Sequence, residues 1–180
     1  MSFKFEKTEI EGVLLVIPQI HHDSRGLFME TFREDIFQEQ GIPKFVQDNR
    51  SKSIMGVIRG IHFQKYPKPQ GKLVSCTMGC IFDVAVDLRK GSPTYKKWIM
   101  EELNDYNGHM LYVAAGCGHA FLATSLMADV SYRCTNYYNK ELDAGIRWDD
   151  PDIGIDWNKT SLHFAISEKD KNLPFLKDIS

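Results

Sequence analysis

The chain has 180 residues, of which 43% are hydrophobic and 26% charged, and its formal net charge at pH 7 is −2. This length fits one domain over residues 1–180, with a core large enough to fold without disulfides or a structural metal. The near-neutral charge excludes a strongly basic nucleic-acid surface, and no apolar run approaches the ~20 residues of a membrane span. The polar start lacks the apolar core of a signal peptide, so we expect a cytoplasmic protein with neither membrane nor nucleic-acid partners.

Short segments rich in β-branched and aromatic residues follow one another along the chain, separated by turn signals such as GSP and AGCG. In chain order, the expected strands cover residues 12–18, 26–32, 55–64, 72–78, 80–89, 95–103, 109–115, 119–125 and 129–138. The two expected helices cover residues 33–41 and 167–173. Many short, regularly spaced strands predict an all-β sandwich or barrel with a few short helices.

The four cysteines favour reduced, buried thiols. Cys76 and Cys80 lie four residues apart, whereas Cys117 and Cys134 are isolated. This spacing matches neither a paired CxxC zinc site nor a compact disulfide framework.

Three expected strands each carry one ionisable side chain on a face that is otherwise mainly apolar, and these side chains are Lys72, Tyr132 and His62. By strict alternation, His62 shares its face with Ile58, Gly60 and Gln64. If all three faces point into one barrel, its interior is a pocket with an amine, a phenol and an imidazole. Arg59 then falls on the opposite face, unless Gly60 marks a β-bulge or Arg59 lies near a strand end.

Each of these residues has a structural and a catalytic interpretation. His62 is either a hydrogen-bonded barrel residue or a proton carrier near neutral pH, which suits an imidazole. Lys72 is either a solvated edge residue or a fixed charge for a developing oxyanion, and Tyr132 is either core or a proton donor. His119 follows a turn and is open to both interpretations. Asp170 cannot be preferred over the other acids from the residues alone.

A metal site is disfavoured by the pattern of histidines. A histidine pair on one strand face would need a histidine two residues after His62, where Gln64 stands, and the adjacent His21 and His22 point to opposite faces of a strand. A second polar group, with Arg25 and with residues 47–50, is typical of solvated junctions but also suits a phosphate and the edge of a base.

Eight motifs occur in order over residues 8–175. They are DSRGLFMETF, FVQDNRSKS, VIRGIHFQ, QGKLVSCTMGCIFDVAVDLRKGSPTYKKW, GCGHAF, TNYY, GIRWDDPDIGIDW and ISEKD. In these motifs the chain resembles the dTDP-4-dehydrorhamnose 3,5-epimerase family of the cupin superfamily. The resemblance implies a cupin jelly-roll barrel, or double-stranded β-helix, in a homodimer with exchanged N-terminal strands. It also implies that neither a metal nor an organic cofactor is needed.

The resemblance implies epimerisation of dTDP-4-dehydro-6-deoxy-D-glucose at C3 and C5 to dTDP-4-dehydro-L-rhamnose, in dTDP-L-rhamnose biosynthesis. By position in the motifs, His62 is the base, Asp170 its orienting carboxylate, Lys72 the enolate-stabilising cation and Tyr132 the proton donor. The implied substrate-binding residues are Arg25, Glu30, Gln47, Asp48, Asn49, Arg59, His119, Tyr138, Asp143 and Lys169. Some of these are expected to reach across the dimer.

The chain departs from the family pattern at Gly116-Cys117-Gly118, where an aromatic and an alanine are commoner, and at Arg50, where histidine is common. Both departures are expected to affect the pocket rim rather than the reaction type. Two alternatives stay open: a mono-epimerase acting at C3 or C5 alone, and a cupin that binds nucleotide sugars without catalysis. A metal-dependent cupin enzyme is the least favoured interpretation.

Overall fold

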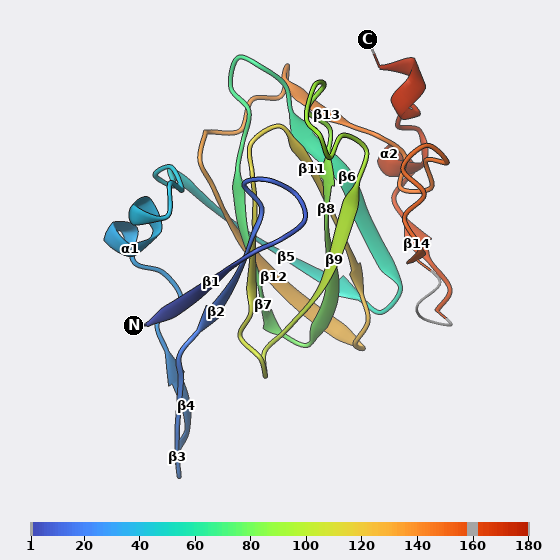
Figure 1. The fold of residues 1–180 in the computed structure, drawn as a ribbon. Helices are drawn as coiled ribbons and strands as arrows, with labels where there is room; N and C mark the ends of the chain where they lie inside the picture. The colour runs from blue at the N-terminus through green and yellow to red at the C-terminus, as the bar shows by residue number, and fades with distance from the viewer. Residues whose placement is uncertain (1, 158–161, 180) are drawn as a thin grey trace.

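The computed structural model describes residues 2–157 and 162–179, and these form two six-stranded sheets and a separate hairpin (Figure 1). Across the first sheet, the order is β1 (Phe3–Lys7), β2 (Leu14–Pro18), β10 (Met110–Val113), β7 (Lys72–Met78), β12 (Met127–Cys134) and β5 (Gln47–Ile54). Across the second, it is β13 (Asp143–Gly145), β6 (Val57–Gln64), β11 (Cys117–Ala123), β8 (Cys80–Asp87) and β9 (Trp98–Asn104), with β14 (Ala165–Ile166) beside β6. The hairpin consists of β3 (Ile20–Asp23) and β4 (Gly26–Met29).

The chain crosses repeatedly between the two sheets, because β5, β7, β10 and β12 belong to one and β6, β8, β9 and β11 to the other. Neighbouring strands of the two sheets are antiparallel, except that the short β14 runs parallel to β6. This alternation is the connectivity of a jelly roll, so the predicted all-β barrel of cupin type is confirmed. The helices with bounds inside the described residues are short: α1 (Glu34–Glu39), α2 (Glu168–Lys171) and the 3₁₀ turn η2 (Leu176–Asp178). None of the helices in the described ranges is long and apolar enough to cross a membrane.

All nine expected strand ranges contain a strand, but five strands were not predicted: β1, β3, β5, β13 and β14. The instructive case is β5, whose inward-facing residues Asn49, Ser51 and Ser53 are polar. This strand lines a hollow instead of packing in the core, so it lacks the apolar alternation by which strands are recognised. The expected strand 129–138 ends at Cys134, and Tyr138 lies in the loop that follows.

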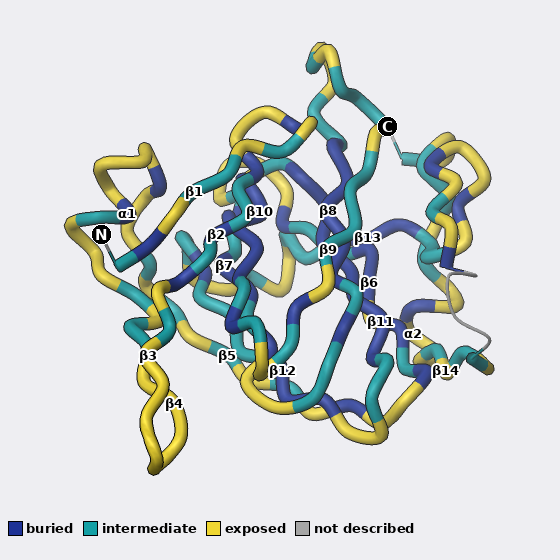
Figure 2. The backbone as a smooth tube through the Cα atoms, turned by 60° about the horizontal axis from the view of Figure 1, so that its bottom comes forward, coloured by how far each residue is buried: buried dark blue, intermediate teal, exposed yellow. Residues whose placement is uncertain are grey.

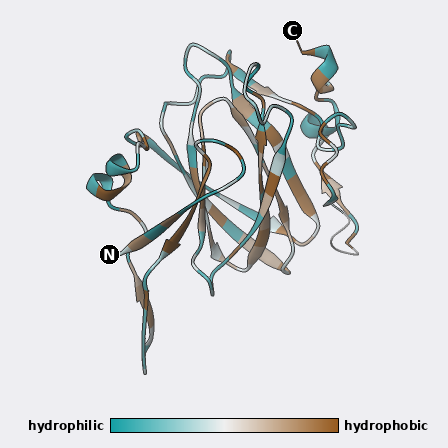
Figure 3. Ribbon diagram, in the orientation of Figure 1, coloured by the Kyte–Doolittle hydropathy of each residue, from teal (hydrophilic) through white to brown (hydrophobic). Residues whose placement is uncertain are grey.

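Apolar side chains form two separate clusters. The first fills the barrel interior away from the hollow and covers the outer face of the first sheet, where Phe3 and Phe37 pack edge to face. The second lies on the outer face of the second sheet, where Ile61 and Leu122 contact the C-terminal segment through Ile153 and Trp157. Figures 2 and 3 show these buried and hydrophobic stretches along the facing sheets, with the β3–β4 hairpin exposed and apart from them. The second cluster thereby anchors the segment that carries α2 to the barrel.

Strand β6 carries an irregularity at Gly60. His62 pairs with His119 and Arg59 with Phe121, so three steps along β6 match two along β11. The extra residue is a β-bulge, and it turns both Arg59 and His62 toward the cavity between the sheets. Strict alternation was therefore wrong for Ile58, which packs in the second apolar cluster instead of sharing the face of His62.

Replacing Gly60 by alanine is expected to destabilise the fold and distort the cavity. The backbone φ of Gly60 is +122°, and an added Cβ would lie 2.5 Å from the Ala120 Cβ. Both effects disfavour a side chain, and we expect Gly60→Ala to lower the free energy of unfolding by about 1–3 kcal/mol. Urea denaturation of the purified variant measures the loss.

Gly91→Ala is the matched control, because Gly91 also has a positive φ, +92°, but no atom within 4 Å of its added Cβ. The control should lose less stability than Gly60→Ala. Equal losses would show that backbone conformation alone matters and that the close approach of β6 to β11 does not.

Candidate active site

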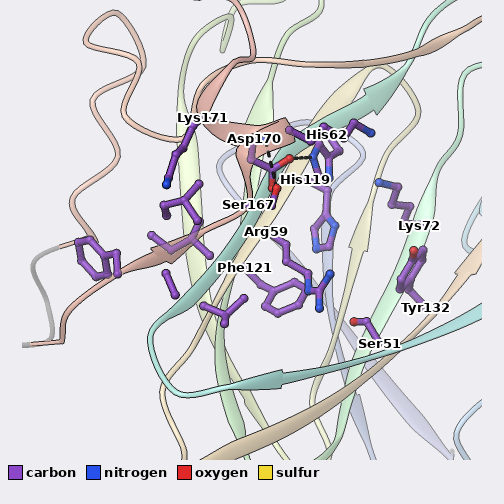
Figure 4. A pocket seen from close by; sticks show the side chains of 16 residues that line it. Ser51, Arg59, His62, Lys72, His119, Phe121, Tyr132, Ser167, Asp170 and Lys171 are labelled. Atoms are coloured by element: carbon purple, nitrogen blue, oxygen red, sulfur yellow. Dashed lines mark hydrogen bonds and ion pairs between the residues drawn. The ribbon is translucent and has the colours of Figure 1, made fainter.

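A cavity of about 710 Å³ opens between the two sheets beside α2 (Figure 4). Residues of both sheets and of the C-terminal segment line it, including Ser51, Arg59, His62, Lys72, His119, Phe121, Tyr132, Lys169 and Asp170. The predicted convergence of an imidazole, an amine and a phenol on one hollow is therefore present in the structure. In Figure 4 the side chains of His62 and His119 descend from one wall, and those of Lys72 and Tyr132 face them from the other.

His62 is paired with Asp170, a residue 108 positions away in the sequence. The Nε2 atom of His62 lies 2.8 Å from Oδ1 of Asp170, and the Gly60 amide donates to Oδ2 of the same carboxylate at 3.4 Å. Asp170 sits in the single turn of α2, where its own amide donates to the N-cap hydroxyl of Ser167. The apolar anchoring of the C-terminal segment and this cap together position the carboxylate.

Asp170 is buried, and burial by itself raises the pKa of a carboxyl group. The hydrogen bond and charge of His62, with the Gly60 amide, outweigh burial, so the pKa of Asp170 lies below its ordinary value. At neutral pH the group is therefore a carboxylate that accepts from His62. An imidazole held in this way keeps one nitrogen protonated and presents the other as a base.

Lys72 and Tyr132 come from the neighbouring strands β7 and β12, and the Lys72 Nζ lies 5.9 Å from the centre of the Tyr132 ring. Burial lowers the pKa of Lys72, while the groups of Cys134, Asp83 and Asp143 oppose this shift. Burial raises the pKa of Tyr132, so its hydroxyl is a donor at neutral pH. The pair offers a cation and a proton donor on one wall of the cavity.

A second imidazole–carboxylate pair lies on the same sheet as His62, across the cavity from Lys72 and Tyr132. His119 Nε2 is 2.7 Å from Oδ1 of Asp83, and both side chains are buried. Burial raises the pKa of Asp83, with His119 and Lys72 opposing the shift. Sequence reasoning missed Asp83, although an acid inside the apolar strand CIFDVAVD was a usable signal, because buried acids require partners.

Arg59 reaches across from β6 to β5, where its Nε donates to the Ser53 hydroxyl at 3.1 Å and its Nη2 to the Lys52 carbonyl at 3.2 Å. The guanidinium lies on the cavity wall near Phe121 and Ser51. Ser51 was not predicted as a site residue. Its hydroxyl is buried and has no hydrogen-bond partner within the described residues.

At the rim, five predicted binding residues form one network. Lys169 Nζ and the Tyr138 hydroxyl both donate to Oδ2 of Asp143, at 2.7 and 3.3 Å. The Tyr138 amide donates to Gln47, whose side-chain amide in turn donates to Asn49. Four segments distant in sequence thus meet beside Lys169, which lines the cavity.

Three other predicted binding residues lie away from this cavity. Arg25 pairs with Asp23 in the turn of the β3–β4 hairpin, and Glu30 follows β4. Asp48 lies on the outer face of the first sheet, where the Ser131 hydroxyl donates to it at 3.3 Å. These residues can meet a substrate only through a neighbouring subunit or a different site.

The two departures from the family pattern also lie outside the cavity. Cys117 is buried in the first apolar cluster, and Arg50 on the outer face donates to Asp129 at 2.7 Å. The expectation that they shape the pocket rim is not met within this chain. All four cysteines are free thiols, and three of them are buried, as predicted. In residues 2–157 and 162–179, no three His, Cys, Asp or Glu side chains gather into a group that could hold a metal ion.

Comparison with known proteins gives the family directly. Residues 7–178 match the family model of dTDP-4-dehydrorhamnose 3,5-epimerase. The chain belongs to this family. An enzyme of that name from Methanothermobacter thermautotrophicus is 51% identical over 98% of this chain and 96% of its own length.

Members of the family also share this structure. A dTDP-6-deoxy-D-glucose-3,5-epimerase of Legionella pneumophila, solved in complex with dTDP-4-keto-L-rhamnose, superimposes with a TM-score of 0.94 at 39% identity, covering 99% of this chain and 95% of that one. A Streptomyces niveus relative named dTDP-4-dehydrorhamnose 3-epimerase is 41% identical over 82% of this chain and 72% of its own length. The relatives of this chain therefore include one named for epimerisation at a single carbon.

The Asp170 contact predicts how stability responds to acid. The folded-state pKa of Asp170 lies below its unfolded-state pKa of about 3.9. The contribution of Asp170 to the free energy of unfolding is therefore fully present above the unfolded-state pKa, and it is lost as the pH falls through the folded-state pKa. Asp170→Asn should therefore flatten the fall of the free energy of unfolding below pH 4, by up to about 1.4 kcal/mol per pH unit. Urea denaturation across a pH series measures this slope.

Asp152→Asn is the control, since Asp152 also has a lowered pKa, from Lys96, but both side chains are exposed to solvent. Screening makes such surface pairs weak, so the control should keep the parent slope. A parent-like slope in Asp170→Asn would contradict the assignment of Asp170 as a carboxylate that His62 and the Gly60 amide stabilise.

Proposed function

We propose that this protein epimerises dTDP-4-dehydro-6-deoxy-D-glucose at C3 and C5 to dTDP-4-dehydro-L-rhamnose, a step of dTDP-L-rhamnose biosynthesis. Residues 1–180 act as one domain in the cytoplasm and need neither a metal nor an organic cofactor. The observation that carries the proposal is the meeting of His62–Asp170, Lys72 and Tyr132 in one cavity of a chain from this family. Binding alone would not require an acid–base set of this kind.

Epimerisation next to a ketone begins with removal of a proton from the carbon beside C4. This carbon is acidic only if the negative charge that flows onto the C4 oxygen is stabilised. Lys72 supplies a positive charge on the cavity wall, where the effective dielectric constant is lower than in bulk water. We assign it to the enolate oxygen.

His62 is the base. Its pairing with the carboxylate of Asp170 holds the ring in one tautomer and stabilises the imidazolium that forms, without Asp170 itself taking the proton. A base of this kind near neutral pH contributes about 10²–10⁴-fold to the rate. The bulge at Gly60 supports the same arrangement, because its amide holds the second oxygen of Asp170.

Inversion requires a proton delivered to the other face of the sugar. Tyr132 stands on the first sheet, whereas His62 stands on the second, so the two groups approach a bound sugar from opposite walls. The raised pKa of Tyr132 keeps the phenol in its donor form. We assign Tyr132 as the proton donor.

The remaining residues bind the rest of the substrate. Arg59 and His119 are placed to contact the sugar and the phosphates, since a guanidinium matches phosphate oxygens in a bidentate manner. The rim network of Gln47, Asn49, Tyr138, Asp143 and Lys169 is the proposed nucleotide site.

The protein forms a homodimer in which the N-terminal strands are exchanged. The β3–β4 hairpin extends away from its own barrel and pairs only with itself in the described part of the chain (Figure 1). Phe28 in this hairpin is 67% exposed, and Leu27 is 47% exposed, which a soluble chain seldom leaves uncovered on so thin an element. In the dimer, the hairpin delivers Arg25 and Glu30 to the partner's cavity, and the outer face with Asp48 lies against the partner.

A mono-epimerase is the second candidate, favoured by the relative named for 3-epimerisation. The two reactions share the base and the enolate-stabilising cation and differ in how many carbons exchange. They separate cleanly by isotope labelling.

Incubation with dTDP-4-keto-6-deoxy-glucose in D₂O tests the function. We expect deuterium at both C3 and C5 of the product, because each carbon loses and regains a proton, and NMR of the purified sugar nucleotide shows the positions. Deuterium at one carbon would identify the mono-epimerase, and deuterium at neither would leave a binding protein. His62→Ala should reduce deuterium exchange by at least about 10²-fold, because it removes the proposed base. Tyr132→Phe should impair product formation more than exchange, because it removes the proposed proton donor. EDTA should change neither the exchange rate nor the rate of product formation.

Mixing two inactive variants tests the exchanged dimer. In a mixed dimer of His62→Ala and Arg25→Ala, one cavity combines the intact His62 of one chain with the intact Arg25 of the other. Activity of the refolded mixture should therefore exceed the sum of the separate variants several-fold. A mixture no more active than that sum would show that Arg25 does not act across subunits.

A further inference from the structure

Gln64 stands two residues after His62, at the end of strand β6. It is 4% exposed, and a buried amide is costly unless its hydrogen bonds are satisfied. Its Nε2 donates to the carbonyl oxygens of Lys68 and Tyr137, the second at 3.2 Å, and its Oε1 accepts from the Asn139 amide at 2.9 Å. This one side chain therefore joins β6 to the loop that follows it and to the loop that follows β12.

The contacts of Gln64 surround Tyr138 on both sides. The Tyr137 carbonyl and the Tyr138 N–H belong to one peptide group, whose oxygen accepts from Gln64 on the second sheet and whose N–H donates to Gln47 on the first sheet at 2.8 Å. The next peptide group donates to Gln64 through the Asn139 amide. Both peptide groups that flank Tyr138 are thus fixed by glutamine side chains from opposite sheets.

The Tyr138 ring depends on this hold, because it has little packing of its own. The residue is 54% exposed and lies in a loop. Its hydroxyl donates to Asp143, and Asp143 is the backbone partner of Gln64 in the pairing of β13 with β6. Gln64 therefore supports Tyr138 at both ends, through its side chain at the backbone and through Asp143 at the hydroxyl.

We propose that Gln64 is a positioning residue for nucleotide binding: it fixes the backbone on both sides of Tyr138, so that the rim network is formed before the substrate arrives. This role rests on the proposed function, which places the nucleotide at the rim network. A loop that is ordered only on binding lowers affinity by the entropy it loses, and a loop held in advance avoids that cost. Gln64 thus acts on nucleotide affinity and not on the proton transfers at the sugar.

Gln64→Met tests this role, because it removes three hydrogen bonds and keeps a side chain of similar length. We expect the Kd for dTDP, measured by isothermal titration calorimetry, to rise about 3–10-fold, since the nucleotide must now order the loop. KM should rise by a similar factor, while kcat at saturation stays within about twofold of the parent. An unchanged Kd, or a loss confined to kcat, overturns the proposal.

Hydrogen exchange of peptides that cover residues 135–142, followed by mass spectrometry, measures the order of the loop without turnover. Faster exchange in ligand-free Gln64→Met, slowed again by saturating dTDP, supports the proposal, and an exchange rate equal to that of the parent overturns it. A parent protein that itself does not bind dTDP would refute the proposed nucleotide site. A variant that binds dTDP as tightly as the parent would refute only the role of Gln64.

Gln70→Met is the matched control. Gln70 is also buried, and its Nε2 donates to the Asn136 carbonyl at 2.7 Å, which connects the same two loops one peptide group before those that flank Tyr138. This control should lower thermal stability with little change in the Kd for dTDP. An equal rise of the Kd in both variants would reduce the effect to general loss of stability and overturn the proposal.

If Gln64→Met does not fold, Gln64→Glu replaces it. The glutamate keeps an acceptor for the Asn139 amide and loses both hydrogens that Gln64 donates to carbonyl oxygens. It therefore carries the same expectations for the Kd, for KM and for hydrogen exchange, and the same results would overturn the proposal.

Discussion

The active cavity depends on one carboxylate that binds two atoms of the same strand. Asp170 accepts from His62 with one oxygen and from the Gly60 amide with the other. The bulge that presents this amide is the irregularity that turns both Arg59 and His62 inward. Without the bulge, one of these two side chains would face the outer apolar cluster, where an unpaired charge is strongly disfavoured. The backbone geometry of β6 and the His62–Asp170 pairing are therefore a single arrangement.

The contact between Asp170 and β6 requires the C-terminal segment to be fixed in position against the barrel. Helix α2 has four residues, too few to be stable by itself, so its position must come from tertiary contacts. The second apolar cluster supplies them, because Ile153 and Trp157 pack on the outer face of the second sheet beside Ile61. Next to the bulge, His62 therefore faces the cavity while its neighbour Ile61 packs in the second apolar cluster. Loss of packing in this outer cluster would therefore displace Asp170 from His62 inside the cavity.

Basic side chains and carboxylates lie together at the cavity, so that charges of opposite sign offset one another. The cavity is lined by Arg59, Lys72 and the imidazoles of His62 and His119, each of which is paired with a carboxylate. A bound sugar nucleotide would exclude most of the water from this space. The polar inner faces of β5 and β6 contribute little to the apolar core, and the barrel makes up for this with apolar clusters at its other end and on both outer faces.

The residues alone predicted the all-β class, the turns and three ionisable side chains on mainly apolar strand faces, because strand periodicity and turn chemistry are local. That these faces point into one cavity was only a condition until the structure was known. Motif order predicted the family, which the comparisons confirm, and through it the proposed roles of His62, Lys72, Tyr132 and Asp170. Local pattern was wrong for Ile58, since a bulge is a relation between two strands, and it missed β5, whose polar inner face has no apolar period.

The pairings that define the site were decided only in three dimensions. Asp170 and His62 are 108 residues apart, and Asp83 and His119 are 36 apart. No periodicity links such positions, because their approach depends on how two sheets close and on where the C-terminal segment packs. Which acids are functional is a question of burial and of neighbours, and both are properties of the folded chain.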